Sequence, residues 1–298
     1  MTDEIPQVDG VEHRFVDANG IRIHIAEAGP DSFRGTPTLL LHGWPQHWYM
    51  WRRLLTGLKG EFRVLAPDLR GFGWTEAPGS GYDGETFVAD QVALLDELGI
   101  ERVSVIGHDW GGWTAMLLGL LHPRRIERLI ACNAPHPWVR VRPGVLIELW
   151  RSWYTWVIAS PVLGRRALEH GWITRNIFER GNVETPFTDD EIEMYVAGFR
   201  DPARAHAVTH LYRYYQRAVR EGATGRRRNT RLEVPALIVF GELDRYISPK
   251  VLDGHEPYAA DMEVELVPDS GHFIVDEKPD LVIARARQFL SAPPLIAG

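Results

Sequence analysis

The chain has 298 residues, a formal net charge of -7 and a single cysteine, Cys132. The acidic balance argues against nucleic acid as a main partner, and one cysteine excludes an intrachain disulfide, so a reducing, cytoplasmic setting is the simplest expectation. The N-terminus lacks the basic and apolar pattern of a secretory signal, and no apolar stretch reaches the ~20 residues of a membrane span. A hydrophobic content of 45% is typical of a globular protein with a large core.

The first part of the chain alternates predicted strands with predicted helices. Two alternating runs, Glu12–Ala18 and Ile21–Ala28, flank a two-residue turn signal and predict a hairpin. Apolar runs predict further strands at 38–41, 62–67, 102–107 and 126–131, and helical spacing predicts helices near 51–58, 86–98 and 113–121. This alternation predicts an α/β fold with a mostly parallel sheet covered by helices on both faces.

The alternation then stops for about a hundred residues, whereas a crossover between parallel strands needs only about a dozen. We therefore interpret residues 137–231 as an inserted helical cap between two parts of one core, 1–136 and 232–298. Within the cap we expect helices at 146–158, 189–199 and 203–219. After it we expect strands at 236–240 and 263–267 and helices at 248–258 and 279–290.

A turn between a buried strand and a helix is the most informative part of the sequence, and Asp109 stands at its centre. Gly107 and Gly111 flank it, in the layout of a nucleophile elbow, where a Cβ on either side would clash. A carboxylate is ionised at neutral pH, so Asp109 is able to attack a carbon that carries a leaving group and form an ester. The alternative is that Asp109 only caps the helix that follows.

Hydrolysis of such an ester needs a base for water, which histidine provides near neutral pH. Of twelve histidines, His272 is the best placed, because it follows the last predicted strand at the same sheet edge as the elbow. We expect Asp244, just past the strand at 236–240, to orient the imidazole, with Glu242 as its rival. The end of the preceding strand is an alternative position for the acid. Asn133 stands there and cannot ionise, so no acid occupies that position.

Ester hydrolysis also builds negative charge on a carbonyl oxygen, which backbone N–H donors stabilise. One expected donor is the N–H of Trp110, the residue after the nucleophile. The other is the N–H of Trp44, in the loop after the strand at 38–41. We expect His42 to buttress that loop rather than to react.

Three motifs carry a resemblance to a known family: His42-Gly43-Trp44-Pro45, Gly107-His108-Asp109-Trp110-Gly111-Gly112 and Ser270-Gly271-His272-Phe273. Together with the order nucleophile, acid, base, they resemble the α/β-hydrolase superfamily. Within it they are most similar to the epoxide hydrolase and haloalkane dehalogenase branch, and to epoxide hydrolases above all. The resemblance implies an eight-stranded sheet with an inserted cap and a cofactor-independent attack on carbon by the aspartate.

In epoxide hydrolases two lid tyrosines donate hydrogen bonds to the epoxide oxygen. Ser152-Trp153-Tyr154 resembles the family motif of the first lid tyrosine, and Leu211-Tyr212-Arg213 resembles that of the second. The resemblance therefore implies Tyr154 and Tyr212 as the two donors. Tyr215 is the alternative candidate for the second donor, if the motif is aligned in a shifted register. The tryptophan-rich cap suggests a small apolar substrate, with water as the second reactant.

Two other functions stay open at this point. A haloalkane dehalogenase would release a halide held by indole N–H groups, from Trp110 and one of Trp153, Trp156 or Trp172. The tryptophan after Gly43 makes this the runner-up, because many dehalogenases carry asparagine or glutamate there. The third function is a non-catalytic ligand-binding protein on a hydrolase scaffold, against which the complete set of catalytic positions argues.

We expect no metal and no cofactor. His206 and His210 lie one helical turn apart, but no glutamate stands beside the first and no third ligand is near. The arginines at 226–228 are expected to form a solvated loop. The expected partners exclude nucleic acid and membrane, and the expected assembly is a monomer or a homodimer.

Overall fold

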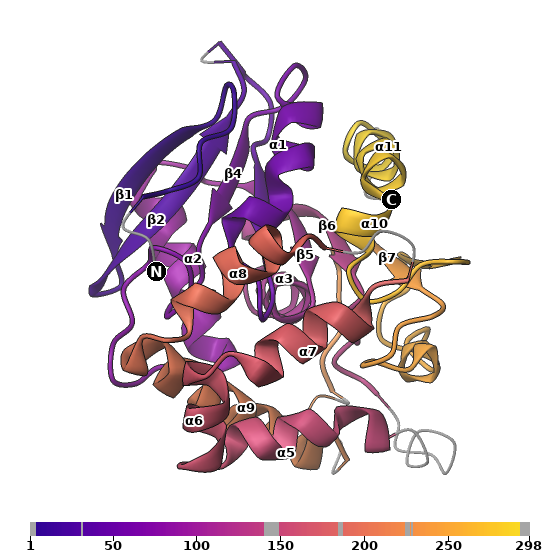
Figure 1. The fold of residues 1–298 in the computed structure, drawn as a ribbon. Coiled ribbons are helices and arrows are strands. Elements are labelled where there is room, and N and C mark those ends of the chain that lie inside the picture. The colour runs from indigo at the N-terminus through magenta and orange to yellow at the C-terminus, as the bar shows by residue number, and fades with distance from the viewer. Residues whose placement is uncertain are drawn as a thin grey trace.

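An eight-stranded sheet runs through the computed structural model, which describes residues 4–30, 32–139, 149–183, 187–223, 227 and 229–292 (Figure 1). The strand order is β1-β2-β4-β3-β5-β6-β7-β8. β2 pairs antiparallel with β1 and with β4, and the other neighbours are parallel. The predicted mostly parallel sheet is therefore confirmed. The strands are β1 (Glu12–Ala18), β2 (Ile21–Ala28), β3 (Thr38–Leu41), β4 (Val64–Pro67), β5 (Val103–His108), β6 (Ile126–Cys132), β7 (Ala236–Gly241) and β8 (Met262–Val267).

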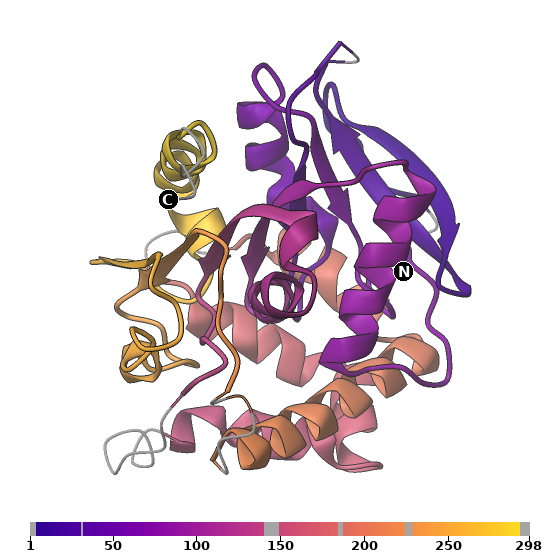
Figure 2. The same cartoon turned by 180° about the vertical axis from the view of Figure 1, so that it is seen from behind.

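Helices cover both faces of the sheet, which is why β3, β4, β5 and β7 are buried along their whole length. Val105 of β5 packs into the core beneath α2 and α3, and the next residue, Ile106, packs into the core beneath α1 and α11. Figure 2 shows α2 and α3, in purple and magenta, on the same side of the sheet. These helices are α1 (Arg52–Leu58), α2 (Gly84–Glu97), α3 (Trp110–Leu121) and α11 (Pro279–Leu290).

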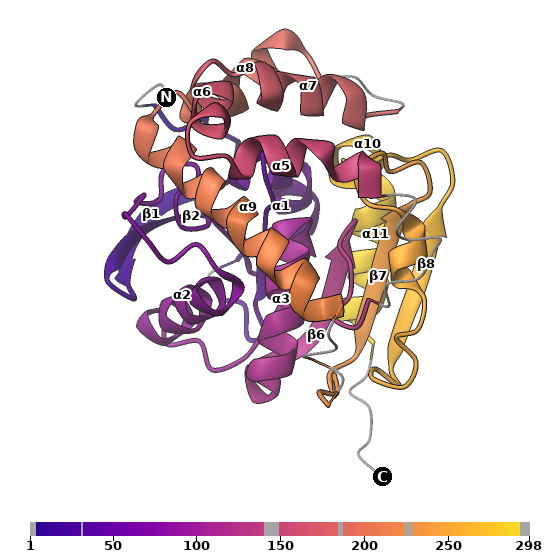
Figure 3. The same cartoon turned by 90° about the horizontal axis from the view of Figure 1, so that it is seen from below.

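Five described helices separate β6 from β7, and we call them the insertion helices. They meet the core where the tyrosines of two of them, Tyr154 and Tyr212, contact the ring of Trp44. Viewed from below, α5 and α9 lie side by side (Figure 3). None of the described helices, α9 included, is long and apolar enough to cross a membrane. The insertion helices are α5 (Trp153–Ala159), α6 (Leu163–Glu169), α7 (Trp172–Gly181), α8 (Asp189–Gly198) and α9 (Pro202–Ala223).

Two predicted helices differ from the structure. The first part of the helix expected at 146–158 lies outside the described residues, and the rest is a 3-10 turn, η3 (Leu149–Ser152), followed by α5. The helix expected at 248–258 is wrong, because only a 3-10 turn, η4 (Pro249–Leu252), forms there. Gly254 follows with φ +85°, and Pro257 has no N–H to extend a helix. The other short elements are η1 (Trp48–Trp51), η2 (Pro123–Arg125) and α10 (Ile274–Glu277).

Candidate active site

Asp109 occupies a strained turn between β5 and α3. Its φ of 52° and ψ of -116° are rare for a residue with a side chain, and such strain gathers at functional positions. The flanking glycines allow the turn: a Cβ on Gly107 would lie 2.3 Å from the carbonyl oxygen of Gly111, and one on Gly111 would lie 1.8 Å from that of Leu41. The prediction that both positions require glycine therefore agrees with the packing.

The Asp109 carboxylate does not cap α3, so the capping interpretation is wrong. Its Oδ1 instead accepts a hydrogen bond from the N–H of Trp44 at 3.0 Å, and the N–H of Trp110 is a second donor to the carboxylate. Burial raises the pKa of Asp109 to about 6, while His272 and the two N–H groups oppose the shift. At neutral pH the carboxylate is therefore mostly ionised.

His272 lies between two carboxylates. Its Nδ1 is 2.8 Å from Oδ2 of Asp244, and its Nε2 is 3.9 Å from Oδ2 of Asp109. Burial opposes protonation of the imidazole, but the charges of Asp244 and Asp109 and the hydrogen bond to Asp244 outweigh it and raise the pKa of His272. The side chain of Glu242, the rival acid, is exposed to solvent and does not join this group.

Asp244 is held by three donors besides the histidine. The N–H groups of Tyr246 and Ile247 donate to its Oδ1 at 2.7 and 3.0 Å, and the amide of Asn133 donates to its Oδ2 at 2.7 Å. Burial opposes ionisation, yet His272 and these hydrogen bonds together lower the pKa of Asp244. From the sequence, Asn133 is only a position where an acid could have stood. The signal that was available is that β6, which Asn133 follows, neighbours β7, which Asp244 follows.

The backbone around His272 is fixed by residues that sequence reasoning missed. The N–H of His272 donates to the carbonyl oxygen of Gly181, at the end of α7, at 3.0 Å. Nε2 of His108 donates to the carbonyl oxygen of His272 at 2.8 Å, and burial lowers the pKa of His108 to about 3, so it stays neutral. The N–H of Gly271 donates to Oε2 of the buried Glu277 at 2.9 Å.

Both predicted tyrosines lie above Asp109. The ring of Tyr154, on α5, stacks on Trp44 with centroids 6.0 Å apart, and that of Tyr212, on α9, lies 5.8 Å from Tyr154 and 5.9 Å from Trp110. Burial raises the pKa of each tyrosine well above its ordinary value, so both hydroxyls keep their protons. Hydrogen bonds to Trp110 and Tyr154 partly oppose the shift at Tyr212. For Tyr215 the opposing hydrogen bond is to Ser152.

The structure does not bring the other proposed indoles into this site. The side chains of Trp153, Trp156 and Trp172 are 45%, 62% and 48% exposed. The rings of His206 and His210 are 4.1 Å apart, but in the described part of the chain no three His, Cys, Asp or Glu side chains are arranged so that they could hold a metal ion.

The loop that carries Trp44 rests on a buried polar group. The N–H of Leu69 donates to Nε2 of His42 at 2.9 Å, so the proton of the neutral imidazole is on Nδ1 and faces the carbonyl oxygen of Gly43 at 3.1 Å. Beside it, the buried Asp68 accepts hydrogen bonds from the N–H groups of Trp48 and Trp74 at 2.8 and 2.9 Å. The ring of His24 lies 2.8 Å from Oδ2 of the same carboxylate. This geometry supports a buttressing role for His42.

Comparisons with known proteins agree with the fold. A family profile described as the alpha/beta hydrolase fold matches residues 36–279. The chain is 32% identical to AB hydrolase superfamily protein YfhM of Bacillus subtilis (strain 168), over 92% of this chain and 96% of that protein. It is 29% identical to the soluble epoxide hydrolase of Corynebacterium sp. (strain C12), over 94% and 98%. A solved structure of the epoxide hydrolase CorEH without ligand superposes with a TM-score of 0.80 at 28% identity, covering 94% of this chain and 99% of that chain.

Proposed function

Because the chain belongs to the α/β-hydrolase family and is an epoxide hydrolase-like enzyme, we propose that it opens an epoxide to a vicinal diol through a covalent ester on Asp109. One observation carries the proposal. Two backbone N–H groups, those of Trp44 and Trp110, hold the Asp109 carboxylate, while its Oδ2 faces His272 at 3.9 Å. One carboxylate oxygen is thus in an oxyanion site and the other faces the base.

In the first step, Oδ2 of Asp109 attacks a ring carbon of the epoxide, and the carbon–oxygen bond of the strained ring breaks. The leaving oxygen takes a proton from Tyr212 or Tyr154, whose buried hydroxyls remain protonated. An alkoxide is a poor leaving group, so epoxide opening needs this proton donation. Halide release does not need it. The product of the step is an alkyl ester whose carbonyl oxygen is Oδ1.

In the second step, His272 removes a proton from water, and the hydroxide attacks Cγ of Asp109. The N–H groups of Trp44 and Trp110 stabilise the negative charge on Oδ1, at ~3 kcal/mol each. The Cγ–Oδ2 bond then breaks, and the departing diol oxygen takes the proton from His272. The proton left on the carboxylic acid returns to the tyrosinate, so the enzyme is restored.

Asp244 acts on this cycle through the imidazole. Its hydrogen bond to Nδ1 supports the tautomer whose Nε2 accepts the proton, and its charge stabilises the imidazolium. We assign the insertion helices, with predicted boundaries 137–231, the role of a cap that excludes water and presents an apolar wall. The substrate class we propose is a small apolar epoxide, with water as second substrate and no cofactor.

A single turnover in heavy-oxygen water, with enzyme in excess over styrene oxide, tests the covalent route. The diol should contain no heavy oxygen, and mass spectrometry should find the label in the peptide that contains Asp109. Label in the first diol would instead mean that water attacks the epoxide directly. Halide release from short haloalkanes, without diol from styrene oxide, would favour the dehalogenase alternative. Epoxide binding without turnover, unchanged by Asp109→Ala, would favour a non-catalytic binding protein.

A further inference from the structure

The outer surface of the insertion helices carries a group of exposed apolar side chains that the proposed reaction does not use. We call these six residues the tryptophan face, and they make up half of the twelve large apolar side chains exposed in the described part of the chain. Natural surfaces rarely gather so much apolar area without a partner. The exposed fractions are 70% for Trp150, 45% for Trp153, 62% for Trp156, 60% for Val162, 56% for Leu163 and 48% for Trp172.

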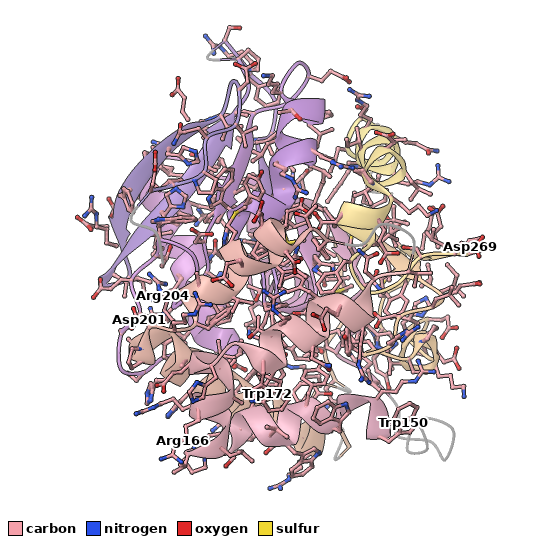
Figure 4. All side chains as sticks on the ribbon, viewed as in Figure 1. Trp150, Arg166, Trp172, Asp201, Arg204 and Asp269 are labelled. Atoms are coloured by element: carbon pink, nitrogen blue, oxygen red, sulfur yellow. The ribbon has the colours of Figure 1, made fainter. Side chains whose placement is uncertain are left out.

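The residues of the tryptophan face lie on elements that follow one another in the chain, and the helices among them pack against one another in turn. Trp150, Trp153 and Trp156 are spaced three residues apart across η3 and α5, so their side chains project from one side of this segment. Val162 and Leu163 lie at the turn into α6, which packs against α5. Figure 4 shows Trp150 of η3, Trp172 of α7 and Arg166 of α6 in the lower part of the molecule.

The helices that carry this face, and the helix α9 packed beside them, are rich in arginine, although the whole chain is acidic at -7. The segment from 150 to 181 contains five arginines and two glutamates, and α9, which packs beside α5, contains four arginines and one glutamate. Arg166, Arg217 and Arg220 are exposed, and none of them pairs with a carboxylate among the described residues. On α6, Glu169 is already paired with Arg165 at 2.9 Å.

The acidic residues of the insertion helices gather elsewhere, on α8. Asp189 forms an ion pair with Arg175 at 2.8 Å, and Glu191 pairs with Arg52 of the core at 2.9 Å. Charge is therefore divided between the two regions: Arg166, Arg217 and Arg220 are exposed and pair with no carboxylate among the described residues, whereas Asp189 and Glu191 of α8 pair with arginines there and in the core.

We propose that the tryptophan face docks on an anionic lipid surface. Indole rings are amphipathic and prefer the boundary between headgroups and acyl chains, and arginines beside them are attracted to anionic headgroups. A second copy of this chain fits less well, because a twofold axis through the face would bring the same arginines opposite one another. The expectation of no membrane partner depends on the lack of a spanning segment, and docking on a lipid surface needs no such segment.

Docking would also bring the lipid close to the candidate active site. The helix α5 carries Trp153 and Trp156 on its exposed side and the buried Tyr154 on its inner side. A helix with its side chains is about 10 Å across, so the lipid would lie about one helix diameter from the tyrosine. Apolar epoxides dissolve in lipid and would reach the site from there. This consequence rests on the proposed function, whereas the docking itself does not.

Sedimentation of the full chain with lipid vesicles tests the docking without any measure of turnover. We expect the protein to sediment with vesicles that contain phosphatidylglycerol, to stay in solution with phosphatidylcholine alone, and to be released by salt. The double variant Trp150→Ser/Trp156→Ser should lose binding, and Arg166→Glu should weaken it by about fivefold or more. Leu121→Ser is the matched control, because Leu121 is 45% exposed but lies at the end of α3.

Thermal unfolding of each variant, followed by circular dichroism, checks that it is folded. Equal sedimentation of the wild type and the double variant would overturn the proposal, as would the lack of any binding to phosphatidylglycerol vesicles. A wild-type dimer that the double variant converts to monomer would assign the face to a second copy instead. Diol formation from a water-soluble epoxide, measured in parallel, should be equal in the wild type and the double variant. A folded chain that binds vesicles but forms no diol would reject the proposed function and leave the docking intact.

Discussion

Asn133 donates a hydrogen bond of 2.7 Å to the same oxygen of Asp244, Oδ2, that lies 2.8 Å from His272. A second bond runs from its amide nitrogen to the carbonyl oxygen of Gly271 at 3.1 Å, and its Oδ1 accepts the N–H of Gly241 at 3.3 Å. Asn133 thus joins Asp244 to the loop that carries His272. Its contacts lead to the first of five predictions.

Moving the carboxylate from position 244 to position 133 should restore part of the activity that Asp244→Asn removes. Asp244→Asn alone should lower kcat by about 10⁴-fold, because the imidazole loses its tautomer and its counter-charge. Adding Asn133→Asp places a carboxylate beside the same imidazole, and kcat in steady-state assays should recover by at least about tenfold. In the wild-type background Asn133→Asp should instead be harmful, since two buried carboxylates would repel each other. A double variant no faster than Asp244→Asn would contradict this.

Between pH 6 and the raised pKa of His272, the covalent ester should accumulate. The pKa of Asp109 is about 6, so its carboxylate attacks in this range, but a protonated His272 cannot take a proton from water. Lowering the pH through the pKa of His272, which lies above its ordinary 6.5, therefore slows hydrolysis before it slows alkylation. Acid quenching followed by intact-mass measurement detects the ester. An ester fraction that does not change with pH would count against the scheme.

Tyr212→Phe should lower the rate of epoxide opening by about 10²-fold, and Tyr215→Phe should change it much less. Hydrogen bonds join Tyr212 to Trp110 and Tyr154, above Asp109, while that of Tyr215 goes to Ser152. Single-turnover kinetics with styrene oxide separate this step from ester hydrolysis. Equal losses in the two variants, or a larger loss for Tyr215→Phe, would reassign the donor.

Glu277→Gln should lower the pKa of His272 while leaving the fold intact. Glutamine keeps an acceptor for the N–H of Gly271, which now donates to Glu277 at 2.9 Å, but it removes a negative charge that raises the pKa of the imidazole. Proton NMR of His272 during a pH titration measures the shift directly. Glu277→Ala removes the acceptor as well and should reduce kcat by up to about a hundredfold through displacement of the loop. An unchanged titration in Glu277→Gln would limit Glu277 to a structural role.

Asp68→Asn should destabilise the protein by about 3 to 5 kcal/mol, because a buried charge partner is removed from a group of mutual hydrogen bonds. An amide nitrogen cannot accept the hydrogen bonds from the N–H of Trp48 or Trp74, nor pair with His24 as the carboxylate does. Urea unfolding followed by tryptophan fluorescence gives the loss. Asp17→Asn, the same change at an exposed carboxylate of β1, provides a comparison that should cost much less. A similar midpoint for both variants would refute the prediction.

Local signals were enough to predict the elements that surround the reacting atoms. The elbow was readable because a buried strand, two glycines and a helix must follow one another within a few residues around Asp109. The hairpin at Asn19 and Gly20 and the strands of the parallel sheet were predicted for the same reason, because their turn residues and their hydrophobic pattern are local in the sequence.

The residues that support Asp244 and His272 from other parts of the chain depend on the fold, and they were not predicted. Asn133 and Asp244 are 111 positions apart, and His272 and Gly181 meet only because α7 returns to the sheet edge. Helical spacing also failed where a breaker overrides it. A helix was expected at 248–258, but only the 3-10 turn Pro249–Leu252 forms. Gly254, with a φ of +85°, prevents its continuation as a helix.

The hydrogen bond from His272 to the carbonyl oxygen of Gly181 limits how this scaffold tolerates recombination. A Cβ at Gly181 would lie 2.6 Å from atoms of both Phe273 and Tyr246, so the segment approaches the core through a gap that only glycine fits. A chimera that exchanged residues 137–231 for those of another hydrolase would have to reproduce that glycine and its carbonyl direction. Otherwise His272 would lose its backbone anchor even though Asp109, Asp244 and His272 had all been retained.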